Sequence, residues 1–259
     1  RNLKRQVRYP IVSLVHHLRC SEVHAQPAKR IYRLVEKAYL RSVDGFIFNS
    51  QTTRESVREF VPQLPDHIIA YPGGDRLGDG LQENQIRQRT QEVRPLRVLF
   101  LGSLTRRKGL KTLLRACEQL ERGTVELTII GSQTAEPRYA RNIMAHIDKL
   151  KNELSITVLK ALPAPALPEM MLSQDILVVP SSYEGFGIVY LEGMAFGLPA
   201  IASTSGAAHE TIQHGQNGLL IDPGDNQTLA RHLREIAADR GRLLTLSLRA
   251  LETHRQGPT

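Results

Sequence analysis

Apolar and polar residues follow one another in short blocks along the chain, and in its second half these blocks come in a regular order. Continuous apolar runs, typical of strands buried on both faces of a parallel sheet, are separated by stretches with helical spacing. The runs cover residues 97–101, 125–130, 156–159, 176–179 and 199–202, and the helical stretches cover 110–120, 138–151, 166–172 and 189–196. Because strands that alternate with helices imply right-handed crossovers, we expect an α/β fold with a mainly parallel, doubly wound sheet.

The beginning of the chain carries a shorter version of this pattern. The run from Pro10 to His17 predicts a short strand covered on both faces, and residues 27–41 predict a helix because their apolar side chains recur at helical spacing. A second strand at 45–49 and a helix at 52–61 capped by Ser50 follow.

A change in composition then separates the two halves. Between residues 71 and 95 the chain is rich in Gly, Asp, Gln and Arg and poor in apolar residues, which is typical of a connector. We interpret residues 1–75 as a partial N-terminal Rossmann-like domain, 76–95 as a linker and 96–259 as the C-terminal domain.

The excess of basic over acidic residues indicates which kinds of molecule the chain can bind. Lys and Arg number 34 against 26 Asp and Glu, and the net charge of +8 favours an anionic partner. Nucleotide diphosphates, nucleic acid and acidic lipid headgroups meet this condition. Aromatic residues make up only 5% of the chain and no RNA or DNA motif is present, so we expect no nucleic-acid partner.

The cysteines and the hydropathy bear on the compartment. Cys20 and Cys117 lie far apart with no CxxC spacing or histidine at ligand intervals, so neither a disulfide framework nor a metal site is expected. No apolar run approaches the ~20 residues that cross a bilayer, and Arg1–Arg8 lacks the apolar stretch of a signal peptide. We therefore expect a cytoplasmic protein.

The first candidate for chemistry is residues 102–109, Gly-Ser-Leu-Thr-Arg-Arg-Lys-Gly, between a predicted strand and a predicted helix. Backbone amides at a helix start attract a phosphate, and Arg106, Arg107 and Lys108 add positive charge there. The helix dipole contributes only about 0.3–1 kcal/mol, so the cations should supply most of the attraction. The alternative is an ordinary turn with solvated basic side chains.

The second candidate is the Gly-rich turn after the strand at 176–179, which carries Glu184 and leads into a helix that carries Glu192. Seven residues separate the two carboxylates, so both can face one cleft from different depths. Glu184 alone is also explained as a first-turn carboxylate that complements the helix dipole, and Glu192 as a solvated helix residue. Because Glu192 is flanked by apolar residues, however, it should need a partner.

Taken in order, these motifs resemble those of the family 4 retaining glycosyltransferases. Glu184 and Glu192 match the E-x7-E signature, and the match extends from Arg97 to Arg240 through Leu101-Gly102, Lys108-Gly109, the segment 193–199, the segment 205–210 and the segment 215–225. The resemblance implies the two-domain GT-B fold, with a nucleoside diphosphate sugar held mainly by the C-terminal domain.

By position, the resemblance implies that Lys108 contacts the diphosphate, Glu192 the ribose and Glu184, as a catalytic residue, the donor sugar. It implies a second catalytic residue, His16, at the end of the first strand, for which His17 and a purely structural histidine pair are the alternatives. We expect further donor-binding residues in the two loops. Phe186, Gly187, Ile188 and Val189 would act through their backbone amides, and the other positions are Gly102, Ser103, Arg107 and Gly185.

Two features depart from the family pattern. Ser103 stands where relatives place Arg after the loop glycine, and our hypothesis is that Arg106 or Arg107 reaches the diphosphate instead. The chain also opens almost directly at the strand that holds His16. From the resemblance we therefore expect that roughly one third of a typical enzyme of this type is absent, and that the chain is a fragment, a split protein or a truncated gene product.

The resemblance implies a retaining glycosyltransferase that moves a sugar from a nucleotide sugar to a hydroxyl acceptor, which is a glycan, a lipid or a small molecule, without a metal or other cofactor. The alternative is a non-catalytic or degenerate nucleotide-sugar-binding module. A nicotinamide-dependent oxidoreductase would need a GxGxxG turn, which is not present. The basic residues of the helix at 27–41 indicate either a solvated face or peripheral contact with an acidic inner membrane face.

Overall fold

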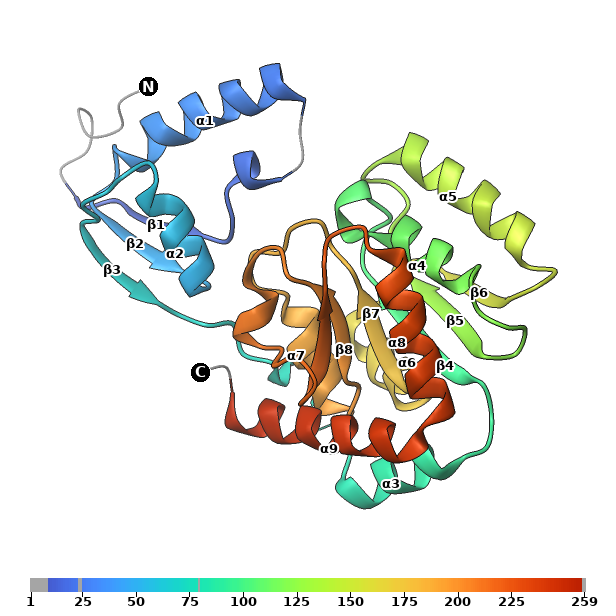
Figure 1. Cartoon of the computed structure of the whole chain (residues 1–259). Coiled ribbons are helices and arrows are strands. Elements are labelled where there is room, and N and C mark those ends of the chain that lie inside the picture. The colour runs from blue at the N-terminus through green and yellow to red at the C-terminus, as the bar shows by residue number, and fades with distance from the viewer. Residues whose placement is uncertain (1–8, 23–24, 79, 258–259) are drawn as a thin grey trace.

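The structure is a computed structural model that describes residues 9–22, 25–78 and 80–257, so the basic start Arg1–Arg8 lies outside the described residues. Figure 1 shows two lobes, each built on its own parallel sheet. We call the part formed by residues 9–71 the small lobe and the part around the second sheet the large lobe. This arrangement confirms the expected α/β fold.

The sheet of the small lobe has three parallel strands in the order β1-β2-β3, and α1 and α2 pack on one of its faces. The strands are β1 (Val12–Val15), β2 (Gly45–Phe48) and β3 (Asp66–Ile69), and the helices are α1 (Gln26–Leu40) and α2 (Gln51–Arg58). The core between sheet and helices contains Phe46, Phe48 and Val57. As predicted, Ser50 caps α2, since its Oγ accepts a hydrogen bond from the amide of Thr53 at 3.0 Å.

The opposite face of this sheet is exposed, which corrects the prediction that the first strand is covered on both faces. Val12 and Leu14 are 55% and 56% exposed, and Ile68 is 59% exposed on the same face, because register pairs Leu14 with Ile47 and Ile47 with Ile68. The apolar residues Leu34 and Val35 of α1 are exposed as well. The predicted strand is therefore present, but only every second side chain of β1 is buried.

The large lobe contains six parallel strands in the order β6-β5-β4-β7-β8-β9. They are β4 (Leu96–Leu101), β5 (Val125–Ile130), β6 (Ser155–Leu159), β7 (Ile176–Val179), β8 (Ala200–Ser203) and β9 (Gly218–Ile221). The chain runs outward from β4 through β5 to β6, then returns to add β7 on the other side of β4. The strand order therefore reverses between β4 and β7, and ligands of doubly wound sheets bind at the carboxyl ends of the strands at such a point.

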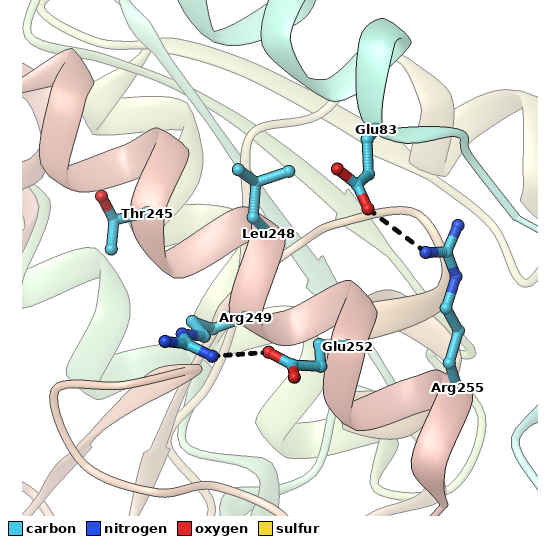
Figure 2. Close-up of a pocket in the computed structure, with 6 residues that line it drawn as sticks. All are labelled: Glu83, Thr245, Leu248, Arg249, Glu252 and Arg255. Carbon is cyan, nitrogen blue, oxygen red and sulfur yellow. Dashed lines mark hydrogen bonds and ion pairs between the residues drawn. The ribbon is translucent and has the colours of Figure 1, made fainter.

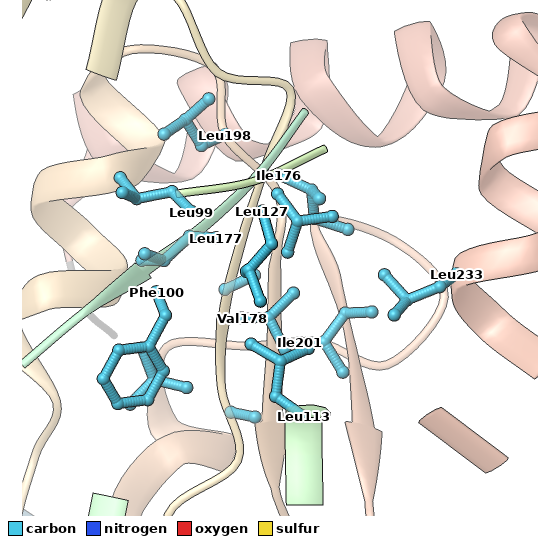
Figure 3. Close-up of a cluster of buried hydrophobic side chains, with 14 of the residues drawn as sticks. Leu99, Phe100, Leu113, Leu127, Ile176, Leu177, Val178, Leu198, Ile201 and Leu233 are labelled. Atoms are coloured by element: carbon cyan, nitrogen blue, oxygen red, sulfur yellow. The ribbon is translucent and has the colours of Figure 1, made fainter. Parts of the chain in front are cut away.

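Helices surround this sheet, and a continuous apolar core fills the layers (Figure 3). They are α4 (Leu110–Cys117), α5 (Pro137–Leu150), α6 (Leu167–Leu172), α7 (Ile188–Ala195), α8 (Asn226–Ala238) and α9 (Arg240–Gln256). The side chains of Leu99, Leu177 and Ile201, from three adjacent strands, are fully buried. Within the described residues, no helix combines the length and the apolar character that a membrane crossing requires.

The described residues of the segment between the sheets make several contacts with the large lobe. The segment contains a helix that the polar composition did not predict, α3 (Glu83–Gln91), which packs on α9 and includes the fully buried Ile86. Arg89 of this helix donates hydrogen bonds to the carbonyls of Phe196 and Gly197, both at 2.9 Å. Further along, Arg94 makes a bidentate pair with the fully buried carboxylate of Asp175, at 2.5 and 3.0 Å. These contacts fasten the connecting segment to the large lobe.

Candidate functional site

The loops that follow β4 and β7 lie against each other at the point where the strand order reverses. The amide of Ser182 donates to the carbonyl of Arg107 at 2.7 Å. Gly109 has a φ of +74°, and a Cβ at this position would lie 2.0 Å from the carbonyl oxygen of Pro180. Only a glycine fits this close approach. The turn at 102–109 is therefore built to bring its basic residues beside the loop that carries Glu184.

Two cations of the first loop meet the carboxylate of the second. In the 3-10 turn Arg106–Lys108, Lys108 Nζ lies 2.8 Å and Arg107 Nη1 3.4 Å from Glu184 Oε2, to which Ser181 Oγ donates at 3.0 Å. Burial raises the pKa of Glu184, but the charges of Lys108 and Arg107 outweigh it, and the pKa lies below its ordinary value. Glu184 is therefore ionised, and the site combines two cations with one fixed anion.

Of the two candidate arginines, the structure brings Arg107 to this cluster. Arg106 points outward with 78% of its side chain exposed and lies 3.8 Å from Glu136. Gly102 and Ser103 follow the last residue of β4 and are partly buried, and neither carries a charge. The positive charge at this turn comes from the residues after Ser103.

The N-terminus of α7 adds backbone donors to the same place. Gly187, with a φ of +86°, immediately precedes α7, which begins without a side-chain cap. The first amides of a helix have no partner within the helix, and here they belong to Ile188 and Val189. Tyr190 Oη donates to the carbonyl of Val179 at 2.8 Å, which fixes α7 on the end of β7. The predicted segment Gly185–Val189 therefore forms a turn suited to an anion.

Glu192 lies one turn into α7 and makes its ion pair elsewhere. Its side chain is 2% exposed, and Oε1 accepts a hydrogen bond from Arg76 Nε at 2.7 Å. Arg76 belongs to the connecting segment, and 54% of its side chain is exposed. The apolar neighbours of Glu192 predict that it has a partner, but no local pattern in the sequence points to Arg76, because the two residues are distant in the chain. Glu184 and Glu192 thus face different cations in this structure.

The small lobe contributes a histidine and a carboxylate. His17 Nε2 lies 3.0 Å from Glu22 Oε1, and the same oxygen lies 3.5 Å from Arg107 Nε. The ring of His17 also lies 6.4 Å from that of Tyr183. The side chain of His16 is exposed at the end of β1. The histidine that joins this polar network is therefore His17, the alternative to His16, and Glu22 was not predicted.

Direct hydrogen bonds hold the two lobes together beside this network. Ser50 Oγ donates to the carbonyl of Gly185 at 2.7 Å. Glu210, in the 3-10 helix Ala207–Glu210 of the large lobe, accepts hydrogen bonds from the amides of Gln51 and Thr52, both at 2.8 Å, and from Tyr71 Oη at 3.1 Å. The carboxylate of Glu210 thereby occupies the N-terminus of α2, where a negative charge is favourable.

A hollow of about 540 Å³ lies away from this site, on the surface between α3 and α9. Figure 2 shows that its charged side chains pair with one another, Arg249 with Glu252 at 2.7 Å and Arg255 with Glu83 at 3.4 Å. Its charges are therefore already neutralised. Over the parts of the chain that the structure describes, no group of three or more His, Cys, Asp or Glu is arranged to hold a metal ion.

Comparisons with known proteins show the family of this chain. The model of the family "Glycosyl transferases group 1" matches residues 82–251. Among curated proteins, an uncharacterised glycosyltransferase of Methanocaldococcus jannaschii is 28% identical, with 93% of this chain and 63% of that protein covered. A D-inositol 3-phosphate glycosyltransferase of Corynebacterium kroppenstedtii is 26% identical, with 88% of this chain and 53% of that protein covered.

Solved structures give the same result. Sucrose-phosphate synthase of Thermosynechococcus elongatus superposes with a TM-score of 0.83 at 26% identity, covering 98% of this chain and 65% of that one. Anabaena HepE, solved in complex with UDP and glucose, superposes with a TM-score of 0.80 at 25% identity, covering 96% and 67%. The chain spans about half to two thirds of the length of the proteins it matches. On the family match and the shared fold, this chain belongs to the group 1 glycosyltransferases.

Proposed function

We propose that this chain carries the donor site of a retaining glycosyltransferase, which moves a sugar from a nucleoside diphosphate sugar to a hydroxyl acceptor. The observation that carries the proposal is the convergence of Lys108, Arg107 and the uncapped start of α7 at the carboxyl ends of β4 and β7. Anabaena HepE, which shares the fold, has been solved with UDP and with UDP-glucose. This supports a uridine nucleotide as the first ligand to test.

In this proposal each group has a role that its surroundings favour. Lys108 and Arg107 pair with the donor diphosphate, and the amides of Ile188 and Val189 donate to its oxygens. As the bond to the sugar breaks, negative charge grows on the leaving diphosphate, and these donors stabilise it without a metal ion. Glu184, kept ionised by the two cations, faces the donor sugar.

Glu192 is the proposed partner of the ribose hydroxyls. Because its other partner, Arg76, is more than half exposed, the pair can rearrange when a nucleotide enters. The expected catalytic histidine, His16, remains a proposal together with the alternative His17, whose ring already lies in the polar network. Residues 1–75 are proposed as the acceptor side, 76–95 as the linker and 96–259 as the donor side.

Calorimetry with UDP and GDP tests the donor site directly. Lys108→Met should weaken binding of the preferred nucleotide about 10- to 100-fold, since a charge-assisted contact contributes about 1.5–3 kcal/mol. Lys111→Met is the matched control, because Lys111 lies exposed on the first turn of α4 and should leave affinity unchanged. Equal affinities for the two variants and the unmodified chain would remove Lys108 from the site.

A second function, a nucleotide-sugar-binding module without turnover, is favoured by one observation. Ser103 leaves the phosphate turn with one cation fewer than the family pattern. A turnover assay with a panel of nucleotide sugars and hydroxyl acceptors separates the two functions. Hydrolysis or transfer supports the enzyme, whereas nucleotide binding without either supports the module.

We also propose an acidic-lipid contact for α1 and a cytoplasmic setting. In α1, Arg30 and Lys37 are exposed together with Leu34 and Val35, which is the side-chain pattern of an interfacial helix. Sedimentation with vesicles of anionic and of neutral lipid tests the contact, and equal recovery with both at low salt would refute it.

A further inference from the structure

Arg107 is shared between carboxylates of the two lobes. Within the large lobe its Nη1 donates to the carbonyl of Tyr183 at 3.0 Å and lies 3.4 Å from Glu184. Its Nε faces the small lobe, 3.5 Å from Glu22 Oε1. Glu22 follows the short 3-10 turn Arg19–Ser21 of the small lobe, so its contact with Arg107 crosses between the lobes. Arg107, which we propose binds the donor diphosphate, is thus already paired with a carboxylate from each lobe.

The charges of this cluster cancel. Lys108 and Arg107 carry two positive charges, and Glu184 and Glu22 carry two negative ones, while the ring of His17 lies beside Glu22. A nucleoside diphosphate brings further negative charge to the same place. Binding it therefore requires that one carboxylate gives up its cation, since two anions at one guanidinium repel each other.

Glu22 is the carboxylate that can do so. Glu184 lies close to Lys108, at 2.8 Å, and accepts a hydrogen bond from Ser181 of its own loop. The contact from Glu22 to Arg107 is longer, at 3.5 Å, and it crosses between the lobes. Glu22 also keeps a partner when Arg107 leaves, because His17 Nε2 lies 3.0 Å away.

We propose that Glu22 is a displaceable counter-charge that occupies Arg107 until the donor diphosphate replaces it, and that it thereby lowers donor affinity. This inference rests on the proposed function, because it assigns Arg107 to the diphosphate. It makes Glu22 a residue that tunes donor binding from the acceptor side, and it couples the arrival of the donor to the release of one contact between the lobes. Because Ser103 supplies no charge, the site depends on Arg107 all the more.

Calorimetry with UDP on the full chain and on Glu22→Gln tests the proposal. Glutamine keeps the size of the side chain and an oxygen facing His17 but removes the charge. UDP should bind about three- to tenfold more tightly, as expected when one charge that opposes the ligand is removed from a partly solvated site. Glu118→Gln is the control for net charge, since it removes one carboxylate from an exposed pair with His146 on the large lobe and should leave affinity unchanged.

A double-variant cycle makes the test specific to Arg107. In an Arg107→Gln background, Glu22→Gln should bring no gain, because the cation that Glu22 occupies is gone. Thermal unfolding of every variant checks that each is folded at the temperature of the titration. Unchanged or weaker UDP binding by Glu22→Gln, with the unmodified chain binding normally, overturns the inference alone. If neither the unmodified chain nor Glu22→Gln binds UDP or GDP, the proposed function falls and this inference with it.

Discussion

The ion pairs of Glu184 allow us to predict how much Glu184→Gln lowers the free energy of unfolding. In Glu184→Gln the side chain keeps its volume and one hydrogen-bond acceptor for Ser181, but Lys108 and Arg107 lose their counter-charge. Removing one partner of a buried ion pair costs about 3–5 kcal/mol, whereas exposed pairs contribute about 0–1 kcal/mol. Glu184 and Lys108 are 12% and 15% exposed and Arg107 is 26% exposed, which is between these cases. We expect a loss of about 1–3 kcal/mol at pH 7.

The pH dependence of this loss has a definite sign. Since the folded-state pKa of Glu184 is lowered, its contribution is fully present above the unfolded-state pKa, about 4.3, and disappears as the pH falls through the folded-state value. The difference in unfolding free energy between the unmodified chain and Glu184→Gln should therefore be constant from pH 7 to about 5 and should shrink below about 4.

Urea denaturation at pH 7, 5 and 4, followed by circular dichroism, measures this difference. Glu118→Gln, in an exposed pair, should change the unfolding free energy by less than about 1 kcal/mol at each pH. Two results would contradict this prediction: Glu184→Gln is as stable as the unmodified chain at pH 7, or its loss of stability is the same down to the lowest pH at which the chain is folded.

Three further predictions concern the rest of the fold. Asp175→Asn should cost about 3–5 kcal/mol in urea denaturation, because it leaves a partly buried arginine facing a neutral group, and a loss under 1 kcal/mol would contradict this. Gly109→Ala should lower the free energy of unfolding by about 2–4 kcal/mol, because the added Cβ meets the carbonyl of Pro180. Gly123→Ala is the control: its φ of +81° is similar but the space around it is open, so the loss should be only about 1–2 kcal/mol. Equal losses would show that the close approach at residue 109 is unimportant. Burial is the main reason that the pKa of both Cys20 and Cys117 is raised to about 12. Iodoacetamide at pH 8 should therefore alkylate neither thiol until urea is added, as measured by mass spectrometry. Rapid alkylation of the folded chain would contradict this prediction.

The periodic part of the fold was predictable because its signal is local. The strands expected at 97–101, 125–130 and 176–179 correspond to β4, β5 and β7 within one residue, since continuous apolar runs of this length are typical of covered parallel strands. The helix α3 gave no such signal, because a single residue of it, Ile86, is an apolar side chain in the core. A nine-residue polar segment does not differ in composition from a loop.

Some contacts of the site follow from the order of the strands, and others do not. Lys108 and Glu184 lie in the loops that follow β4 and β7, which are neighbours in the sheet, so the parallel topology places these loops at the same edge. The pairs of Arg76 with Glu192 and of Glu22 with Arg107 join residues from different parts of the fold, and their formation depends on how the connecting segment and the small lobe settle on the large lobe. No spacing in the sequence encodes that placement.

The contact made by Glu210 has a consequence for movement. It holds α2 of the small lobe by hydrogen bonds to backbone amides and hydroxyl groups, with no apolar side chain of its own. When these groups separate, each can form a hydrogen bond to water instead. Separating them therefore costs much less free energy than exposing an apolar surface to water would. Because the apolar cores of the two lobes are separate clusters, breaking the hydrogen bonds of Glu210 would leave the packing of both cores intact.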